Sequence, residues 1–101
     1  MKTSELNGAA LDWAVAHCIE KGFAKFVAAG YRFCPSTDWS QGGPIIEREC
    51  IELLCESPGF RWVAMPQKGP EWRGLTPLIA AMRCYVASKM GDEIEIPNEL
   101  K

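Results

Sequence analysis

The sequence predicts an α+β fold in which two main helices pack against a short antiparallel sheet. Two apolar stretches with helical periodicity, at about residues 8–21 and 77–90, predict the helices. Two short runs with strand-like composition predict a β-hairpin at about residues 50–65, on which the sheet is built. At 101 residues the chain is expected to form a single domain, 1–101, with a modest core.

Composition and charge indicate an ordinary globular protein. Apolar residues make up 48% of the chain, charged residues 24%, and the net charge is −2, which is too small to predict affinity for nucleic acid or membranes. The charge is unevenly spread, because residues 61–89 hold five basic residues and one acid. We interpret this basic region first as a solvated face and second as a nucleic-acid contact.

Cysteine usage and the lack of targeting signals predict a protein of a reducing cytoplasm. The five cysteines are dispersed without a Cys-x-x-Cys pair, and no secretory leader or membrane-spanning run is expected. The thiols are therefore expected to act as small apolar residues. One histidine and scattered thiols do not form a metal-ligand pattern, and no nucleotide-binding motif occurs, so neither a metal nor a cofactor is predicted.

The first helix is expected to follow a favourable N-cap residue and to end at Gly22. Its apolar residues lie on one side, which places Asp12, Trp13 and His17 on the polar side. We interpret Trp13 and His17 as covered by a later loop, with a patch for a partner as the alternative. The next stretch, 23–33, is interpreted as a partly ordered connection.

The polar segment 35–47 is the predicted binding site, because it combines turn formers, a tryptophan and paired glycines. One helical turn is expected to break at Gly42–Pro44, where freed backbone N–H groups could hold a carboxylate or another anion. We expect Trp39 to fill the core, with a role as anchor for a partner as the alternative. The candidate binding residues, including an arginine of the last helix, are Thr37, Asp38, Trp39, Gln41, Gly42, Gly43 and Arg83.

The predicted hairpin consists of two runs, 50–56 and 60–65, on either side of a turn signal at 57–59. In the first run apolar residues alternate with two glutamates, as expected for a strand with one solvated face. The proline- and glycine-rich stretch 66–74 is predicted to be a loop. Alternating acids and isoleucines at 92–97 predict an edge strand near the end of the chain.

The last helix has the clearest boundaries, with a threonine–proline pair at 76–77 and a terminating Gly91. One side carries bulky apolar residues and the other small uncharged ones, so both sides are expected to be covered. We interpret the cover as the sheet and the first helix; a homodimer through the small side is the alternative. Arg83 beside this apolar surface is expected to pair with Asp38 or Glu47.

Three stretches carry a family resemblance: Leu-Asn-Gly-Ala-Ala-Leu-Asp-Trp near the start, Ser-Thr-Asp-Trp-Ser-Gln-Gly-Gly-Pro-Ile-Ile-Glu-Arg-Glu in the centre, and Thr-Pro-Leu-Ile-Ala-Ala-Met-Arg-Cys-Tyr-Val-Ala-Ser-Lys in the last helix. With them the chain resembles the NinX family of small phage and prophage proteins over nearly its whole length, except residues 23–33 and 57–73. The resemblance implies a phage or prophage origin and expression in the cytoplasm of a bacterial host. It assigns no catalytic residue.

Three function classes remain open at this point. Our leading hypothesis is a non-enzymatic accessory module that binds a host or phage protein through the loop at 37–43. The second is a nucleic-acid-associated protein that uses the basic 61–89 region, with Trp62 and Trp72 for base stacking. The third is a small-ligand binder or an enzyme with its site at the 37–43 loop, although no nucleophile motif occurs.

Overall fold

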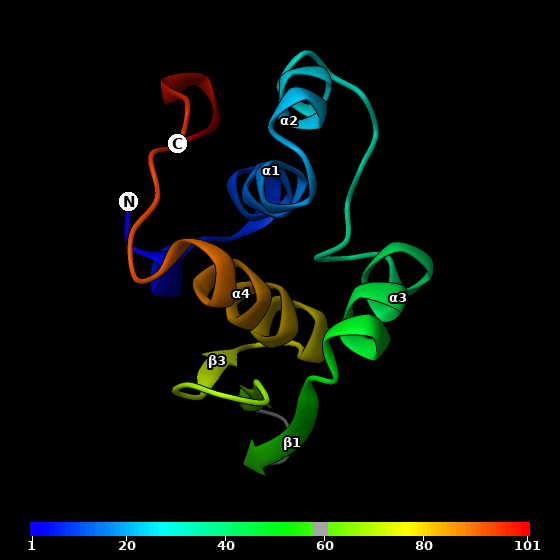
Figure 1. Cartoon of the computed structure of the whole chain (residues 1–101), viewed down its shortest axis with the longest axis vertical. Helices are drawn as coiled ribbons and strands as arrows, with labels where there is room; N and C mark the ends of the chain where they lie inside the picture. Colours follow the sequence, from blue (N-terminus) through cyan, green and yellow to red (C-terminus); the bar gives the residue numbers. More distant parts are fainter. Residues whose placement is uncertain (58–60) are drawn as a thin grey trace.

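The computed structural model describes residues 1–57 and 61–101. It confirms the predicted α+β class, with a three-stranded antiparallel sheet on one side of a central helix and further helices on the other (Figure 1). The elements in chain order are η1 (Thr3–Glu5), α1 (Gly8–Ile19), α2 (Lys21–Ala28), α3 (Trp39–Glu49), β1 (Glu52–Ser57), β2 (Arg61–Met65), β3 (Trp72–Gly74), α4 (Pro77–Met90) and η2 (Asn98–Leu100).

Helix α4 forms the centre of the fold, with the predicted boundaries. The side chain of Thr76 caps it by accepting a hydrogen bond from the backbone N–H of Ile79 at 3.1 Å. The helix packs against β2 and β3 on one side and against α1 and α3 elsewhere (Figure 1), so the predicted cover by sheet and first helix is confirmed. Its small residues Ala80 and Cys84 are buried, and Ala80 lies directly under Gly74 of β3.

The sheet has the strand order β1-β2-β3 and confirms the predicted hairpin. Residues 58–60, where the tight turn is predicted, lie outside the described residues. The register pairs Leu53 with Ala64 and Ala64 with Trp72, which places these three side chains on one face of the sheet. Strand β3 corrects the predicted loop at 66–74. A strand of only three residues is too short to show an alternating pattern in the sequence. This strand is stabilised by pairing with β2 and by contact with α4.

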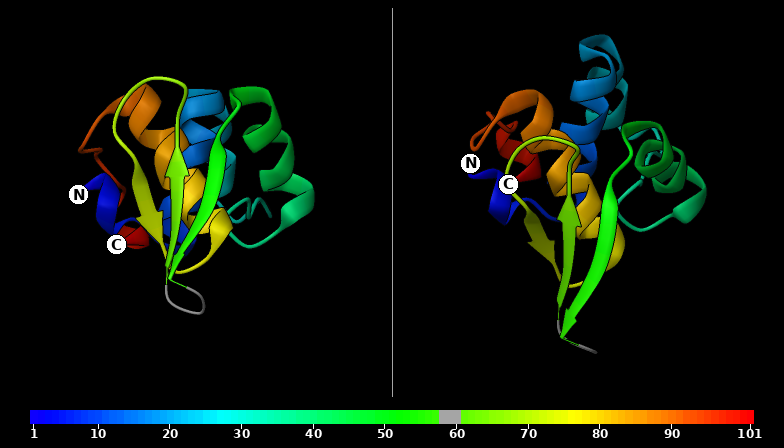
Figure 2. Two further views of the ribbon diagram at one scale, coloured as in Figure 1. Left: turned by 90° about the horizontal axis from the view of Figure 1, so that it is seen from below. Right: turned by 60° about the horizontal axis from the view of Figure 1, so that its bottom comes forward.

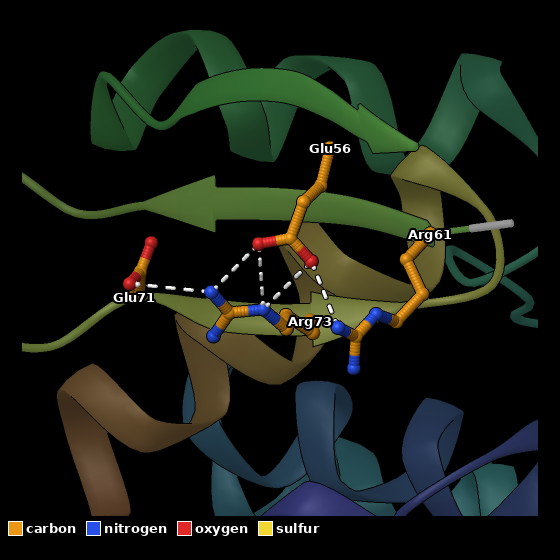
Figure 3. Close-up of polar contacts among 4 residues, drawn as sticks. All are labelled: Glu56, Arg61, Glu71 and Arg73. Carbon is orange, nitrogen blue, oxygen red and sulfur yellow. Dashed lines mark hydrogen bonds and ion pairs between the residues drawn. The ribbon is translucent and has the colours of Figure 1, made fainter. Parts of the chain in front are cut away.

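The helices cover one face of this sheet, and no element of the described chain covers the other (Figure 2). On the open face the central residue of β2, Val63, is nevertheless only 2% exposed. Glu56 of β1 and Arg73 of β3 join above β2 in an ion pair (Figure 3). The alkyl parts of such side chains shield the apolar residue beneath them, which allows the sheet to stand without a second layer.

Helices α1 and α2 differ from the prediction at their junction. Helix α1 ends at Ile19 because Glu20 has an extended backbone with φ −163°, and Gly22 lies inside α2 instead of ending a helix. The stretch 23–33 was predicted to be only partly ordered, but its first part is helical and belongs to α2. The aromatic side chains explain the order, because Phe23 contacts Tyr31 and Phe33 with ring centroids 5.6 and 4.9 Å apart.

The two ends of the chain lie side by side (Figure 1). The amino group of Met1 donates to Ile94 O at 3.0 Å, and the N–H of Thr3 donates to Asp92 O at 2.7 Å. The predicted edge strand at 92–97 is therefore wrong: this segment forms one isolated bridge with the N-terminal residues and does not join the sheet. Its isoleucines are buried in the core, which explains their alternation with acids.

Candidate functional site

The predicted binding segment forms the start of a continuous helix, so the predicted break at Gly42–Pro44 is wrong. Asp38 is the N-cap residue, and its Oδ1 accepts hydrogen bonds from the backbone N–H of Ser40 at 2.9 Å and from the Ser40 hydroxyl at 2.7 Å. These hydrogen bonds lower the pKa of the Asp38 carboxyl. The cap and the packing of α3 against α4 together overcome the poor helix propensity of two glycines and a proline.

The paired glycines do not form an open anion cradle. The N–H of Gly42 donates to Asp38 O at 2.9 Å within the helix. A β-carbon on Gly42 would lie 2.5 Å from Pro35 O and 2.6 Å from Leu78 Cδ2, whereas one on Gly43 would meet nothing within 4 Å. Gly42 is therefore a packing residue that brings α3 against the preceding loop and α4.

Trp39 lies on the surface, and the prediction that it fills the core is wrong. Trp39 is 54% exposed. Beside it is a shallow, mainly apolar hollow of about 250 Å³ between the first turns of α3 and α4. We call its lining the Trp39 surface: Ser36, Thr37, Trp39, Thr76, Pro77, Leu78 and Ile79.

The polar residues of the predicted site bind the chain itself. Gln41 Oε1 accepts a hydrogen bond from the backbone N–H of Cys34 at 2.6 Å, and the Thr37 hydroxyl donates to Cys34 O at 3.4 Å. Thr37 lines the hollow, whereas Asp38 and Gln41 do not. The structure thus brings Thr37 and Trp39 together at one surface and uses Asp38 and Gln41 to hold that surface in place.

Asp12 supports the same loop, which the sequence did not reveal. It was expected on the polar side of the first helix, but it is only 8% exposed, and its Oδ1 accepts a hydrogen bond from the backbone N–H of Ser36 at 2.9 Å. Burial raises the pKa of the Asp12 carboxyl, and the hydrogen bond from the backbone N–H of Ser36 opposes this rise. A backbone donor has no sequence signature, so the helical pattern alone could not indicate this contact.

Arg83 does not pair with Asp38 or Glu47, and that prediction is wrong. Its Nε donates to Leu6 O at 2.8 Å and its Nη1 donates to Arg73 O at 2.9 Å. The side chain therefore ties α4 to the N-terminal segment and to β3. It does not line the hollow beside Trp39, so the predicted site residues do not form one cluster.

The other basic residues of the 61–89 region are largely paired with acids. Arg73 Nη2 lies 2.9 Å from Glu56 Oε2 and 3.4 Å from Glu71 Oε1, and Arg61 Nη2 lies 3.0 Å from Glu56 Oε1 (Figure 3). Lys89 Nζ lies 3.5 Å from a carboxylate oxygen on α3. This arrangement leaves less free positive charge for nucleic acid than the sequence predicts.

The two tryptophans considered for base stacking lie on the helix-covered face of the sheet. Trp62 and Trp72 are half-buried and pack against the core. Their alternation in β2 and β3 places them on the face opposite the ion pairs. At the edge of β3 Trp72 shares a hollow with Arg61 and Arg73, whereas Trp62 does not line it. One half-buried indole at this edge does not provide the row of aromatic side chains on which successive bases of a single strand stack.

The remaining candidate groups are dispersed. Trp13 and His17 stack with ring centroids 5.0 Å apart, and both are half-buried. Burial raises the pKa of the Cys18 and Cys84 thiols to about 11, which keeps them protonated and unreactive near neutral pH. Within the described parts of the chain, no three His, Cys, Asp or Glu residues gather where they could hold a metal ion. No helix there is long and apolar enough to cross a membrane.

A match to a known family covers most of the chain. Residues 2–89 match the sequence profile of the family described as bacteriophage P22 NinX. The chain belongs to the NinX family. The NinX match includes the whole Trp39 surface, Asp12 and Arg83, and it ends in the last turn of α4. No curated protein matches the sequence.

Proposed function

We propose that this NinX chain is a non-enzymatic phage accessory module that binds a host or phage protein through the Trp39 surface. The observation that supports the proposal is Trp39 itself, a large aromatic side chain held half-exposed beside an apolar hollow. Tryptophans in this setting are the residues most often responsible for binding energy in protein interfaces. A protein partner therefore fits this surface better than a small polar ligand.

The Trp39 surface is held in one arrangement before any partner binds. The Asp38 cap fixes the first turn of α3, Gln41 fixes the loop through Cys34, and Gly42 packs on Pro35. A surface that is already ordered loses less conformational freedom on association, so more of the contact energy appears as affinity.

The chemistry of the hollow supports binding and not catalysis. Its polar groups are hydroxyls, from Ser36, Thr37 and Thr76, and none of its lining residues is an acid, a base or a thiol. General acid–base catalysis needs a titratable group within reach of the substrate, and a hydroxyl nucleophile needs a base beside it. The lining meets neither requirement.

Affinity capture with the purified, tagged chain from phage-infected bacteria tests the proposal. We expect a specific host or phage protein to be retained by the wild-type chain and lost with Trp39→Ala. Titration of that purified protein should give about 30-fold weaker binding for Trp39→Ala, the effect of removing one interface hot spot. Circular dichroism should show an unchanged fold, because the removed side chain is half-exposed.

The matched control is Phe26→Ala, which removes another exposed aromatic side chain, 64% exposed on α2. It should leave the affinity unchanged. A captured protein that binds Trp39→Ala as tightly as the wild type would refute the proposal. Equal losses in the two variants would also refute it, because they would indicate non-specific adhesion to exposed aromatic groups.

A further inference from the structure

Arg83 carries a positive charge that the described part of the chain does not neutralise. Its two hydrogen bonds go to backbone carbonyls, Leu6 O and Arg73 O, and the ion pairs among residues 1–57 and 61–101 do not include it. Burial lowers the pKa of this guanidinium, as expected for a charge removed from water without an opposite charge beside it. The two carbonyls use only part of its donor set, so further N–H groups can reach an outside acceptor.

A surface hollow of about 430 Å³ opens beside Arg83, next to the edge strand β3. Its wall includes Ser4 of η1, the half-buried Trp72 and Leu75, whose side chain is 77% exposed. A fixed cation thus lies next to a hydroxyl and to apolar surface. Binding sites commonly combine a few placed polar groups with such an apolar wall.

The charges around this hollow leave room for one negative charge. Arg61, Glu71 and Arg73 also line it, and Glu56 pairs with both of these arginines (Figure 3). Three guanidinium groups, counting Arg83, therefore face two carboxylates. A singly charged ligand would restore neutrality, whereas a doubly charged phosphate would be repelled by the nearby glutamates.

We propose that this hollow binds a carboxylate, with Arg83 as the anchoring donor, and that the carboxylate belongs to an Asp or Glu side chain of a partner polypeptide. The planar guanidinium matches the two oxygens of a carboxylate, and Leu75 and Trp72 contact the apolar part of the same peptide. The polypeptide source rests on the proposed function. It is supported by position, because this hollow and the Trp39 surface adjoin the same turn, at residues 74–76.

Nitrogen–proton NMR of the whole chain tests the site directly. The Nε–Hε signal of Arg83 and the amide signals of Gly74 and Leu75 are followed as sodium acetate replaces sodium chloride at constant ionic strength. We expect saturable shifts with a dissociation constant of roughly tens of millimolar, as for one weak contact, and weaker binding of inorganic phosphate in a parallel titration. Shifts that never saturate in acetate, or tighter binding of phosphate, would overturn the proposal.

A gain in affinity provides a test that loss of folding cannot imitate. Glu71→Gln removes a negative charge from the wall of the hollow and should tighten acetate binding about two- to threefold. The matched control Glu52→Gln removes the same charge from β1, outside the hollow, and should leave the affinity unchanged. Equal gains in both variants would indicate a general charge effect and overturn the assignment. Arg83→Lys keeps the charge without the planar donors and should abolish the saturable shifts; unchanged binding would refute the role of Arg83.

The source of the carboxylate is tested with blocked dipeptides. Acetyl-Leu-Glu-amide should bind more tightly than acetate by about threefold or more, because its leucine adds apolar contact, and acetyl-Leu-Gln-amide should not bind. Equal affinity for acetate and the Leu-Glu peptide would refute the polypeptide source. If acetate binds but the captured partner binds Trp39→Ala as tightly as the wild type, the carboxylate site is retained and the proposed function is rejected. If acetate does not bind but the partner requires Trp39, the proposed function is retained and the carboxylate site is rejected.

Discussion

Two buried glycines, Gly74 of β3 and Gly42 of α3, attach neighbouring elements to α4 in different ways. A β-carbon on Gly74 would lie 2.6 Å from the backbone N and 3.1 Å from the Cα of Ala80. A β-carbon on Gly42 would meet Pro35 O, in a loop, and the end of the Leu78 side chain. Both contacts reach backbone atoms, but those at Gly74 belong to the central helix α4, whereas those at Gly42 are one loop carbonyl and the end of a leucine side chain, which can change rotamer. The hollow beside Arg83 is therefore built on a more rigid contact than the Trp39 surface.

Gly74→Ala should cause the largest effect in this comparison. The added methyl group would force β3 away from α4, and we expect a loss of about 3 kcal/mol in the free energy of unfolding, at the upper end for overpacking. Because β3 also supplies the carbonyl that holds Arg83, acetate binding at the hollow should be lost with it. Urea denaturation and the NMR titration measure the two effects.

Gly43→Ala is the control for Gly74→Ala, because it adds the same methyl group where a β-carbon meets nothing within 4 Å. It lies within α3, where alanine is favoured over glycine by about 0.5–1 kcal/mol. The Cδ of the following Pro44 crowds a β-carbon at this position and offsets this gain, so Gly43→Ala should change the free energy of unfolding by less than about 1 kcal/mol. A Gly74→Ala chain as stable as the wild type would show that β3 is not fixed by backbone contact and would remove the difference between the two regions.

Gly42→Ala should have a smaller effect, about 1–2 kcal/mol of destabilisation. The overpacking against Pro35 O is offset in part by the higher helix propensity of alanine and by movement of Leu78. Since the strain falls on the loop and the first turn of α3, partner binding through Trp39 should weaken while acetate binding beside Arg83 persists. Urea denaturation and the two binding assays separate these outcomes. Equal loss of both binding activities would indicate that the two regions move as one.

Sequence reasoning identified the elements whose signals are local. The cap and proline at residues 76–77 gave α4 its boundaries, and alternation gave the hairpin its strands. Sequence reasoning missed β3, because its three residues show no pattern and its strand conformation depends on pairing with β2. It also wrongly predicted a break in α3 at Gly42–Pro44. Local helix propensity favours a break there, but the N-cap and the packing on α4 keep the helix continuous. Both errors arise where tertiary contact outweighs local preference.

The candidate site was predictable as a segment but not as a geometry. Turn formers and a tryptophan marked residues 37–43, and the exposed Trp39 lies there. The sequence could not show that Gln41 turns inward or that Arg83 bonds to carbonyls. Every residue has a backbone carbonyl acceptor, so the sequence does not indicate which carbonyl a side chain such as Arg83 will bind. An acidic partner for Arg83 was expected because only side chains are visible in a sequence.

Asp12→Asn should have the smallest effect on the free energy of unfolding. The pH dependence of this effect tests whether a charge helps to hold the Trp39 surface. In the wild-type chain burial raises the pKa of Asp12, so the folded state binds this proton more tightly than the unfolded state. Its contribution to stability is then fully present below the unfolded pKa, about 3.9, and is lost as the pH rises through the folded pKa. An asparagine Oδ1 can still accept from the N–H of Ser36, and it does not ionise.

The stability difference between Asp12→Asn and the wild type should therefore grow in favour of asparagine between about pH 3 and pH 7. Urea denaturation across this range measures it. The lowered pKa values of Asp38 and Glu56 make both chains less stable in acid, and this contribution cancels in the difference. A difference that stays constant with pH, or one that shifts toward the wild type as pH rises, would show that ionised Asp12 is stabilised by the loop at Ser36. The Trp39 surface would then be held by a charge, as the region around Arg83 is, and the two regions would differ less than their glycine contacts indicate.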